Sequence, residues 1–172
     1  ELKIVDDQNE TLPNDGRAFG ELLVRGPWIT SGYFKNDESE AHNNDGWFAT
    51  GDVCTIDPAG YMEITDRAKD VIKSGGEWIS SIDLENQAMG HPDVMQAAVI
   101  GVPHADFGEA VVVVVVPDKD DLSLEDVKSE IAGSLAKFKQ PKAVVNVAEL
   151  PRNTMGKVQK NILREKYSDL MD

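Results

Sequence analysis

The amino-acid sequence predicts an α+β protein built from a short β-rich segment, residues 1–66, and a small α/β domain, residues 67–172. The first third alternates short apolar runs with turn-forming residues, which is typical of strands and their connections. The rest alternates helical and strand periodicity. Near Thr65–Asp70 charged residues replace apolar ones, so we place the boundary there. For the second part we expect a three-stranded central sheet with a hairpin and flanking helices.

The β-rich segment contains four predicted strands. They are Glu1–Val5, Gly20–Val24, Val53–Ile56 and Tyr61–Ile64. The last two flank Asp57–Gly60, where proline stands second and glycine fourth, so we expect a type I turn and a β-hairpin. Little in this segment can close a core, and we interpret it as the edge of something larger.

Helices and strands alternate in the second part. The predicted helices are Ile79–Met89, a helix that starts at Ser123 and continues to Leu135, and Val158–Leu170. The predicted strands are Val94–Val102, Ala110–Val116 and Ala143–Val147. The six consecutive valines of the middle strand are typical of a strand buried on both faces, because β-branched side chains favour extended structure. Ser123 followed by Asp126 is an acidic variant of a helix-start signature.

Charge and hydropathy narrow the function classes. The 172 residues include 17 Lys and Arg against 31 Asp and Glu, and such acidity argues against a nucleic-acid binder. Residues 137–172 are basic, with eight Lys and Arg against four Asp and Glu, so they form either a small-anion site or a solvated helix face. No apolar run is long enough to span a bilayer, and residues 1–20 lack a signal-peptide pattern. We therefore expect a soluble, cytoplasmic protein without a transmembrane segment.

Cysteine and histidine usage predicts no metal site. Cys54 is the single cysteine, which excludes an internal disulfide and a Cys-rich zinc site. The histidines His42, His91 and His104 show no metal-ligand spacing with one another or with Cys54. We interpret them as surface or packing residues.

Four segments carry residue types that a scaffold does not require. Thr50–Asp52 joins a glycine to a carboxylate that can accept two hydrogen bonds from a vicinal diol such as ribose; a turn aspartate is the alternative. Asp66–Asp70 packs four charges into five residues, which also fits a solvated linker. The two glycines of Lys73–Trp78 indicate a tight turn, a close ligand approach or a plain loop. Pro151–Val158 brings Lys157 to a helix start, where a cation is disfavoured by about 0.3–1 kcal/mol unless an anion is near.

Taken in order, these segments resemble the C-terminal part of the adenylate-forming acyl-CoA synthetase superfamily. The stretches that carry the resemblance are Gly32–Phe34, Gly46–Asp52, Asp66–Glu77 and Pro151–Lys157, and they span essentially the whole chain. Ile64–Arg67, followed by Trp78–Ser81, is most similar to medium- and long-chain fatty acyl-CoA ligases. The resemblance implies that residues 1–66 end a large ATP- and acyl-binding domain and that residues 67–172 form a small mobile C-terminal domain.

The resemblance implies an acid–thiol ligase that activates a fatty acid with ATP to an acyl-adenylate and transfers the acyl group to coenzyme A. Asp52 would bind the ribose hydroxyls with Arg67 beside it, and Lys69 would be the hinge. Lys157 would be the catalytic lysine that bridges the substrate carboxylate and the α-phosphate. The loop that meets the pantetheine arm of CoA would consist of Ser74, Gly75, Gly76 and Glu77.

The sequence departs from the family where it lacks the phosphate loop and the segment that holds adenine and Mg²⁺. We expect both upstream in a complete enzyme, so this chain is predicted to be a fragment, inactive alone, with ATP and Mg²⁺ bound mainly by the missing part. Asn153 and Met155 stand where Thr or Ala is usual. The alternatives are an aryl- or short-chain-acid CoA ligase, a peptide-synthetase adenylation domain, and a non-catalytic binding module. The cluster Lys137, Lys139 and Lys142 favours CoA over a carrier protein, and a homodimer is left open.

Overall fold

A computed structural model describes residues 1–30, 45–131 and 140–171. Its internal contacts divide the chain into two units, unit 1 (Glu1–Lys69) and unit 2 (Asp70–Asp172). This division follows Lys69, within the stretch Thr65–Asp70 where the composition places the boundary. The assignment of residues 1–66 and 67–172 to domains of a longer enzyme stays a prediction. The predicted motif Gly32–Phe34 and the predicted lysines Lys137 and Lys139 lie outside the described residues.

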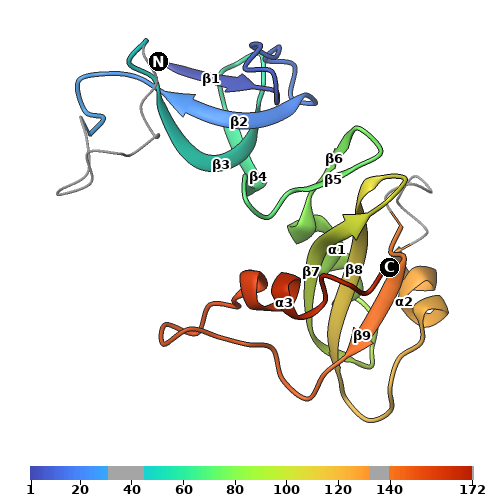
Figure 1. Ribbon diagram of the computed structural model, residues 1–172. Helices are drawn as coiled ribbons and strands as arrows, with labels where there is room; N and C mark the ends of the chain where they lie inside the picture. Colours follow the sequence, from blue (N-terminus) through green and yellow to red (C-terminus); the bar gives the residue numbers. More distant parts are fainter. Residues whose placement is uncertain (31–44, 132–139, 172) are drawn as a thin grey trace. The chain divides into compact units, whose positions relative to one another are not determined.

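Unit 1 is a four-stranded antiparallel sheet in the order β1-β2-β3-β4 (Figure 1). The strands are β1 (Leu2–Val5), β2 (Phe19–Val24), β3 (Phe48–Ile56) and β4 (Met62–Arg67). The structure confirms all four predicted strands and extends β3 toward its N-terminal end, so that Thr50–Asp52 lies within a strand. Between β3 and β4 the Gly60 N–H donates to the Asp57 carbonyl at 2.9 Å, which closes the expected turn.

Unit 2 contains a five-stranded sheet in the order β6-β5-β8-β7, with β9 parallel to β8 (Figure 1). The strands are β5 (Ile72–Ser74), β6 (Glu77–Ile79), β7 (Val94–His104), β8 (Gly108–Pro117) and β9 (Ala143–Asn146). The helices are α1 (Ser81–Ala88), α2 (Leu124–Ile131) and α3 (Lys160–Lys166). The predicted central strands are confirmed as β7, β8 and β9. The structure adds β5 and β6, which the sequence pattern did not identify as strands.

The core of unit 2 lies on both faces of β8, as the valine run predicts. Val111, Val113 and Val115 pack on one face against apolar residues of α1 and α2. The alternate residues, Ala110, Val112, Val114 and Val116, pack on the other face with Leu150 and Leu163. Side chains alternate across a strand, so this single segment forms the middle layer of a three-layer unit.

Helix starts in unit 2 follow local signals, with two exceptions. Ile79, the start of the predicted helix Ile79–Met89, ends strand β6 instead, and α1 begins at Ser81 after the N-cap Ser80. The Asp126 N–H donates to Ser123 Oγ at 3.2 Å and the Ser123 N–H donates to Asp126 Oδ2 at 2.8 Å, as the helix-start signature predicts. The side-chain and backbone hydrogen bonds from Ser123 lower the pKa of Asp126. The predicted helix Val158–Leu170 is shorter in the structure, because Val158 is held in a β-bridge with Arg152 and α3 starts only at Lys160.

The two-faced core generates a stability prediction. Ile100 of β7 is 0% exposed and lies within the cluster under α3. Replacing it with alanine should lower the free energy of unfolding of unit 2 by about 2–5 kcal/mol, since methylene groups are lost and a cavity remains. The matched control is Met95→Ala on the same strand, where the side chain is 54% exposed and the change should stay within about 0.5 kcal/mol. Urea denaturation followed by circular dichroism measures both; equal effects would contradict the assignment of this core.

Candidate functional site

Unit 1 brings Asp52 and Arg67 together, as predicted. The two residues face each other in the pairing of β3 with β4, and Arg67 Nη1 lies 2.6 Å from Asp52 Oδ1. The Asp52 side chain is 23% exposed and that of Arg67 is 55% exposed, so the pair lies at the surface. The guanidinium orients the carboxylate, while Oδ2 of Asp52 has no partner among the described residues. This arrangement leaves an acceptor for hydroxyl groups; its role in nucleotide binding stays a prediction.

The backbone around Asp52 is shaped by Gly51 and Thr50. Gly51 has φ of +73°, a conformation that L side chains rarely adopt, and β3 changes register with β4 just beyond it. Thr50 Oγ1 donates to the Leu22 carbonyl at 3.1 Å and accepts the Asp52 N–H at 3.1 Å. The Ala68 N–H donates to the Gly51 carbonyl at 2.9 Å. A shallow pocket of about 340 Å³ results, lined by Gly51, Arg67, Ala68 and Lys69.

Lys69, the predicted hinge, is exposed and lies between two anchored residues. Ala68 is bonded to Gly51, and Asp70 Oδ1 lies 2.6 Å from Arg164 Nη2 of α3 within unit 2. No backbone hydrogen bond involves Lys69 in the described part of the chain. Lys69 therefore lies between a residue held by its backbone and a residue held by its side chain, a position that suits a pivot.

The glycine segment of unit 2 forms the two-residue turn of the β5–β6 hairpin. Gly75 and Gly76 have φ of +61° and +83°, the left-handed conformation that such turns require, which explains why two strands can form here. Ser74 is buried and pairs with Gly108 of β8. The Gly75 N–H donates to the Phe107 carbonyl at 2.9 Å. The backbone of Phe107 and Gly108 thus supports the turn. Gly75, Gly76 and Glu77 are exposed.

Phe107 is a candidate residue that sequence reasoning missed. Its side chain is 40% exposed and lies beside the glycine turn. Lys142 Nζ lies 5.1 Å from the centre of its ring, and the His104 ring centre lies 4.9 Å away. Of the three predicted lysines, Lys142 is the one that the structure describes. No local pattern marks Phe107, because the antiparallel pairing of β5 with β8 brings it next to residues 74–77.

Lys157 lies in a loop whose backbone is held by hydrogen bonds within the loop itself. The Asn153 N–H donates to the Lys157 carbonyl at 2.9 Å, and the Gly156 N–H donates to the Asn153 carbonyl at 2.9 Å. Asn153 Oδ1 accepts the N–H groups of Met155 at 3.0 Å and of Lys157 at 2.9 Å. Asn153, a departure from the family pattern, is therefore the side chain that organises this loop. The Lys157 side chain is exposed, and its ammonium has no partner among the described residues of unit 2.

Arg152 attaches the Lys157 loop to the sheet. Its Nη1 donates to the Gly156 carbonyl at 2.6 Å and its Nη2 donates to Gln96 Oε1, on β7, at 2.8 Å. On the other side of the loop the Gln159 N–H donates to the Pro151 carbonyl at 2.8 Å. Both flanks of the loop are fixed, so Lys157 is presented from a rigid base.

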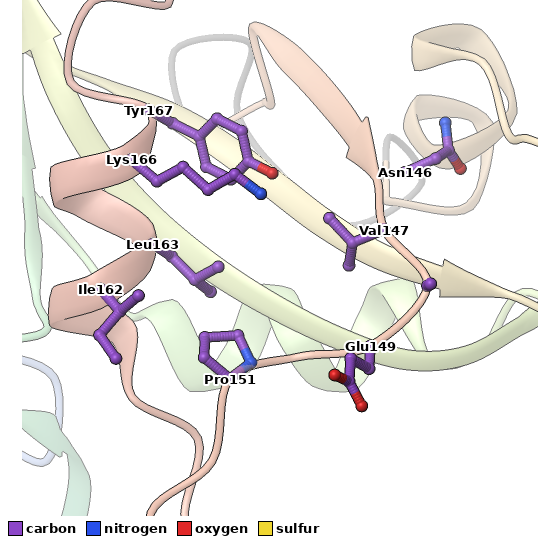
Figure 2. Close-up of a pocket in the computed structure, with 9 residues that line it drawn as sticks. Asn146, Val147, Glu149, Pro151, Ile162, Leu163, Lys166 and Tyr167 are labelled. Atoms are coloured by element: carbon purple, nitrogen blue, oxygen red, sulfur yellow. The ribbon is translucent and has the colours of Figure 1, made fainter.

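A pocket of about 440 Å³ lies between α3 and the segment that follows β9 (Figure 2). Leu163 of α3 and Val147 point into it from opposite sides. None of the predicted site residues lines this pocket. We therefore describe the candidate sites by unit: the Asp52–Arg67 pair in unit 1, and the glycine turn and the Lys157 loop in unit 2.

The described residues hold no group of three or more His, Cys, Asp and Glu side chains that could bind a metal ion. Of the helices that the structure describes, none combines the length and apolar character needed to cross a membrane.

Known proteins match the chain in sequence and in structure. Residues 83–157 match the AMP-binding enzyme C-terminal domain. The 3-methylmercaptopropionyl-CoA ligase of Ruegeria pomeroyi is 50% identical over 172 residues, which are 99% of this chain and 32% of that protein. The medium-chain-fatty-acid–CoA ligase of Ectopseudomonas oleovorans is 47% identical over 99% of this chain and 31% of that protein. This chain therefore spans about a third of the length of these relatives.

Among solved structures, ATP-bound MatB from Rhodopseudomonas palustris matches with a TM-score of 0.85 and 41% identity, over 100% of this chain and 35% of that chain. The o-succinylbenzoate CoA synthetase of Bacillus subtilis, in complex with its acyl-adenylate intermediate, matches with a TM-score of 0.80 and 31% identity, over 95% of this chain and 33% of that chain. The first similarity covers every element of this chain.

Cys54 lies two residues from Asp52, yet its chemistry excludes it as a nucleophile. Burial of the side chain, and then the nearby Asp52 charge, raise the pKa of the Cys54 thiol to about 11. At neutral pH it should remain protonated and unreactive. We expect iodoacetamide to leave Cys54 unlabelled in the native chain and to label it fully in urea, as measured by mass spectrometry. Rapid labelling of the native chain would show that this part of β3 is open to solvent.

Proposed function

The chain belongs to the AMP-binding enzyme family, and on this premise we propose that it is the C-terminal part of a ligase that joins a fatty acid to coenzyme A. Residues 1–66 would end the large ATP- and acyl-binding domain, and residues 67–172 would form the small mobile domain. The names of the similar proteins, which are acid–CoA ligases, support the reaction class. ATP, a fatty acid and CoA are the proposed substrates, and we propose the cytoplasm, where ATP and CoA are both available, as the location.

The proposed reaction has two half-reactions. In the first, a carboxylate oxygen attacks the α-phosphorus of ATP, forming the acyl-adenylate and releasing pyrophosphate. In the second, the thiol sulfur of CoA attacks the acyl carbonyl, forming the thioester and releasing AMP. The residues of this chain contribute charge and shape to both steps.

Lys157 is the residue on which the proposal depends most. Two anions, the carboxylate and the α-phosphate, repel each other as they approach, and a cation between them stabilises the transition state. An exposed ammonium on a loop fixed by Asn153 and Arg152 suits this role, since its free side chain is carried by a preorganised backbone. A solvated surface lysine would need no such support.

Asp52 and Arg67 are proposed to bind the ribose of the adenylate. Two neighbouring hydroxyl groups can donate to one carboxylate, which leaves its remaining acceptor sites for Arg67. The ion pair at 2.6 Å supports this proposal because it sets the orientation of the Asp52 carboxylate before a ligand arrives.

Ser74, Gly75, Gly76 and Glu77 are proposed to meet the pantetheine arm of CoA. A Cβ added at Gly76 would meet nothing within 4 Å, so open space surrounds this backbone. A narrow chain can pass close to glycine where a side chain would obstruct it. Phe107 and Lys142 beside the turn add an aromatic face and a positive charge, which suit the nucleotide end of CoA.

Mg²⁺ is proposed to be bound by the rest of a complete ligase. The described residues offer no cluster of three metal-ligating side chains, so none of the steps derived for this chain depends on the ion.

Replacing Lys157 with alanine in the complete ligase should lower the rate of adenylate formation by about 10²–10³-fold, since one preorganised charge is lost. Thioester formation from supplied acyl-adenylate should change little. ATP–pyrophosphate exchange measures the first step and thioester release measures the second. Lys166→Ala removes a charge from the nearby helix as a control, and the 172-residue chain alone should give no exchange. Equal loss of both half-reactions in Lys157→Ala would contradict the assigned role.

Replacing Lys69 with proline in the complete ligase should preserve adenylate formation and abolish thioester formation. Proline fixes φ near −65° and restricts the preceding residue, so a pivot at Lys69 would keep only one pose. The change removes no backbone hydrogen bond among the described residues, so the melting temperature should stay constant. Lys69→Ala is the control, and it should retain both half-reactions. Survival of thioester formation in Lys69→Pro would place the pivot elsewhere.

A further inference from the structure

Strand β7 has one open edge, and a glutamate covers part of it. In the described part of unit 2, β7 pairs only with β8, so the N–H groups of its outer edge lack a strand partner. The Val99 N–H at this edge donates to Glu85 Oε1, from α1, at 2.8 Å. The carboxylate thus satisfies a backbone group that would otherwise face the helix layer without a partner.

Lys160 completes this arrangement from the other side of the sheet. Its Nζ lies 2.6 Å from the same Glu85 oxygen and donates to Ser81 Oγ at 2.7 Å. The Lys160 and Glu85 side chains are 12% and 20% exposed, and Ser81 is 0% exposed. A largely desolvated ion pair is favourable only when its geometry is good and further hydrogen bonds complete it, as they do here.

This contact connects two layers of unit 2 that the sheet otherwise separates. Leu84 of α1 belongs to the cluster on one face of β8, and Leu163 of α3 belongs to the cluster on the other face. The Lys160–Glu85 pair therefore fixes the start of α3 to α1 around the β7 edge.

We propose that Lys160 is a positioning residue that holds Lys157 in place for adenylate formation. It follows Lys157 by three residues, and both intervening residues are bonded, Val158 through its bridge to Arg152 and Gln159 through the Pro151 carbonyl. The backbone between the fixed Lys160 side chain and Lys157 is therefore held at each residue and has little freedom to move. Arg152 holds the opposite flank on Gln96, so the loop has two attachments, both beside β7.

The proposal rests on the proposed function only in assigning adenylate formation to Lys157. The attachment itself is a property of unit 2 and can be measured without activity. A lysine that merely stabilised the fold would lower the melting temperature without changing the turnover of the molecules that remain folded.

The central experiment compares Lys160→Met with Lys160→Arg in the complete ligase. Lys160→Met should lower kcat of ATP–pyrophosphate exchange by about 10–100-fold with KM for ATP unchanged, since small displacements of a catalytic group are costly. Lys160→Arg keeps a cation for Glu85 and should recover most of the lost kcat. Lys166→Met removes the same charge from the other end of α3, at an exposed position, and should leave kcat unchanged.

A double variant separates positioning from stability. Lys160→Met alone leaves the Glu85 carboxylate without its cation and can destabilise unit 2. Glu85→Gln with Lys160→Met removes both charges and retains an acceptor for the Val99 N–H, so the melting temperature should recover. Positioning by Lys160 predicts that kcat stays low in this double variant. Recovery of kcat together with stability would overturn the proposal.

Amide hydrogen exchange provides the readout that is independent of activity. The N–H groups of Met155 and Lys157, both bonded to Asn153 Oδ1, should exchange faster in Lys160→Met than in the unmodified protein. Unchanged amide hydrogen exchange in Lys160→Met would overturn the proposal. Faster amide exchange with an unchanged kcat in Lys160→Met would also overturn it, provided that Lys157→Ala lowers adenylate formation as expected. If Lys157→Ala itself has no effect, the proposed function fails, and the exchange rates still decide whether Lys160 holds the loop.

Discussion

The valine run of β8 must be covered on both faces, because β-branched side chains leave water only where a second layer meets them on each side. Unit 2 follows from this requirement. Helices α1 and α2 cover one face, while Leu150, Val158 and Leu163 cover the other. The residues that cover the second face belong to the chain segments on either side of the Lys157 loop. The loop is therefore exposed at its tip and fixed at its base, as a reactive side chain on a scaffold requires.

Local signals in the sequence were sufficient for much of this architecture. The valine run, the Ser123–Asp126 capping pair and the Asp57–Gly60 turn each involve residues close along the chain, and the structure has all three. The β5–β6 hairpin was missed because its strands have three residues each, too few to show periodicity. The start of the predicted helix Val158–Leu170 was wrong because a bridge between Val158 and Arg152 overrides helical propensity there.

The candidate site was predictable to a different degree in each unit. Asp52 and Arg67 were expected side by side from the resemblance, and the register of β3 with β4 pairs them. Phe107 and Lys160 depend on contacts between residues distant in sequence, and no spacing rule indicates such contacts. Glu85 looks like any surface glutamate of an amphipathic helix until the open edge of β7 is known. Side-chain position relative to a sheet edge is information that only the fold contains.

Helix α3 is seven residues long, too short to be stable by itself, and it relies on Leu163 and on the ion pairs of Lys160 and Arg164. The second pair has a consequence for the way unit 2 begins. Asp70, the first residue of the unit, is hydrogen-bonded to Arg164 of α3, so the chain's entry into the unit is fastened to the helix that follows the Lys157 loop. Any division of the chain that separates Asp70 from unit 2 therefore also removes a partner of α3, 94 residues away in sequence.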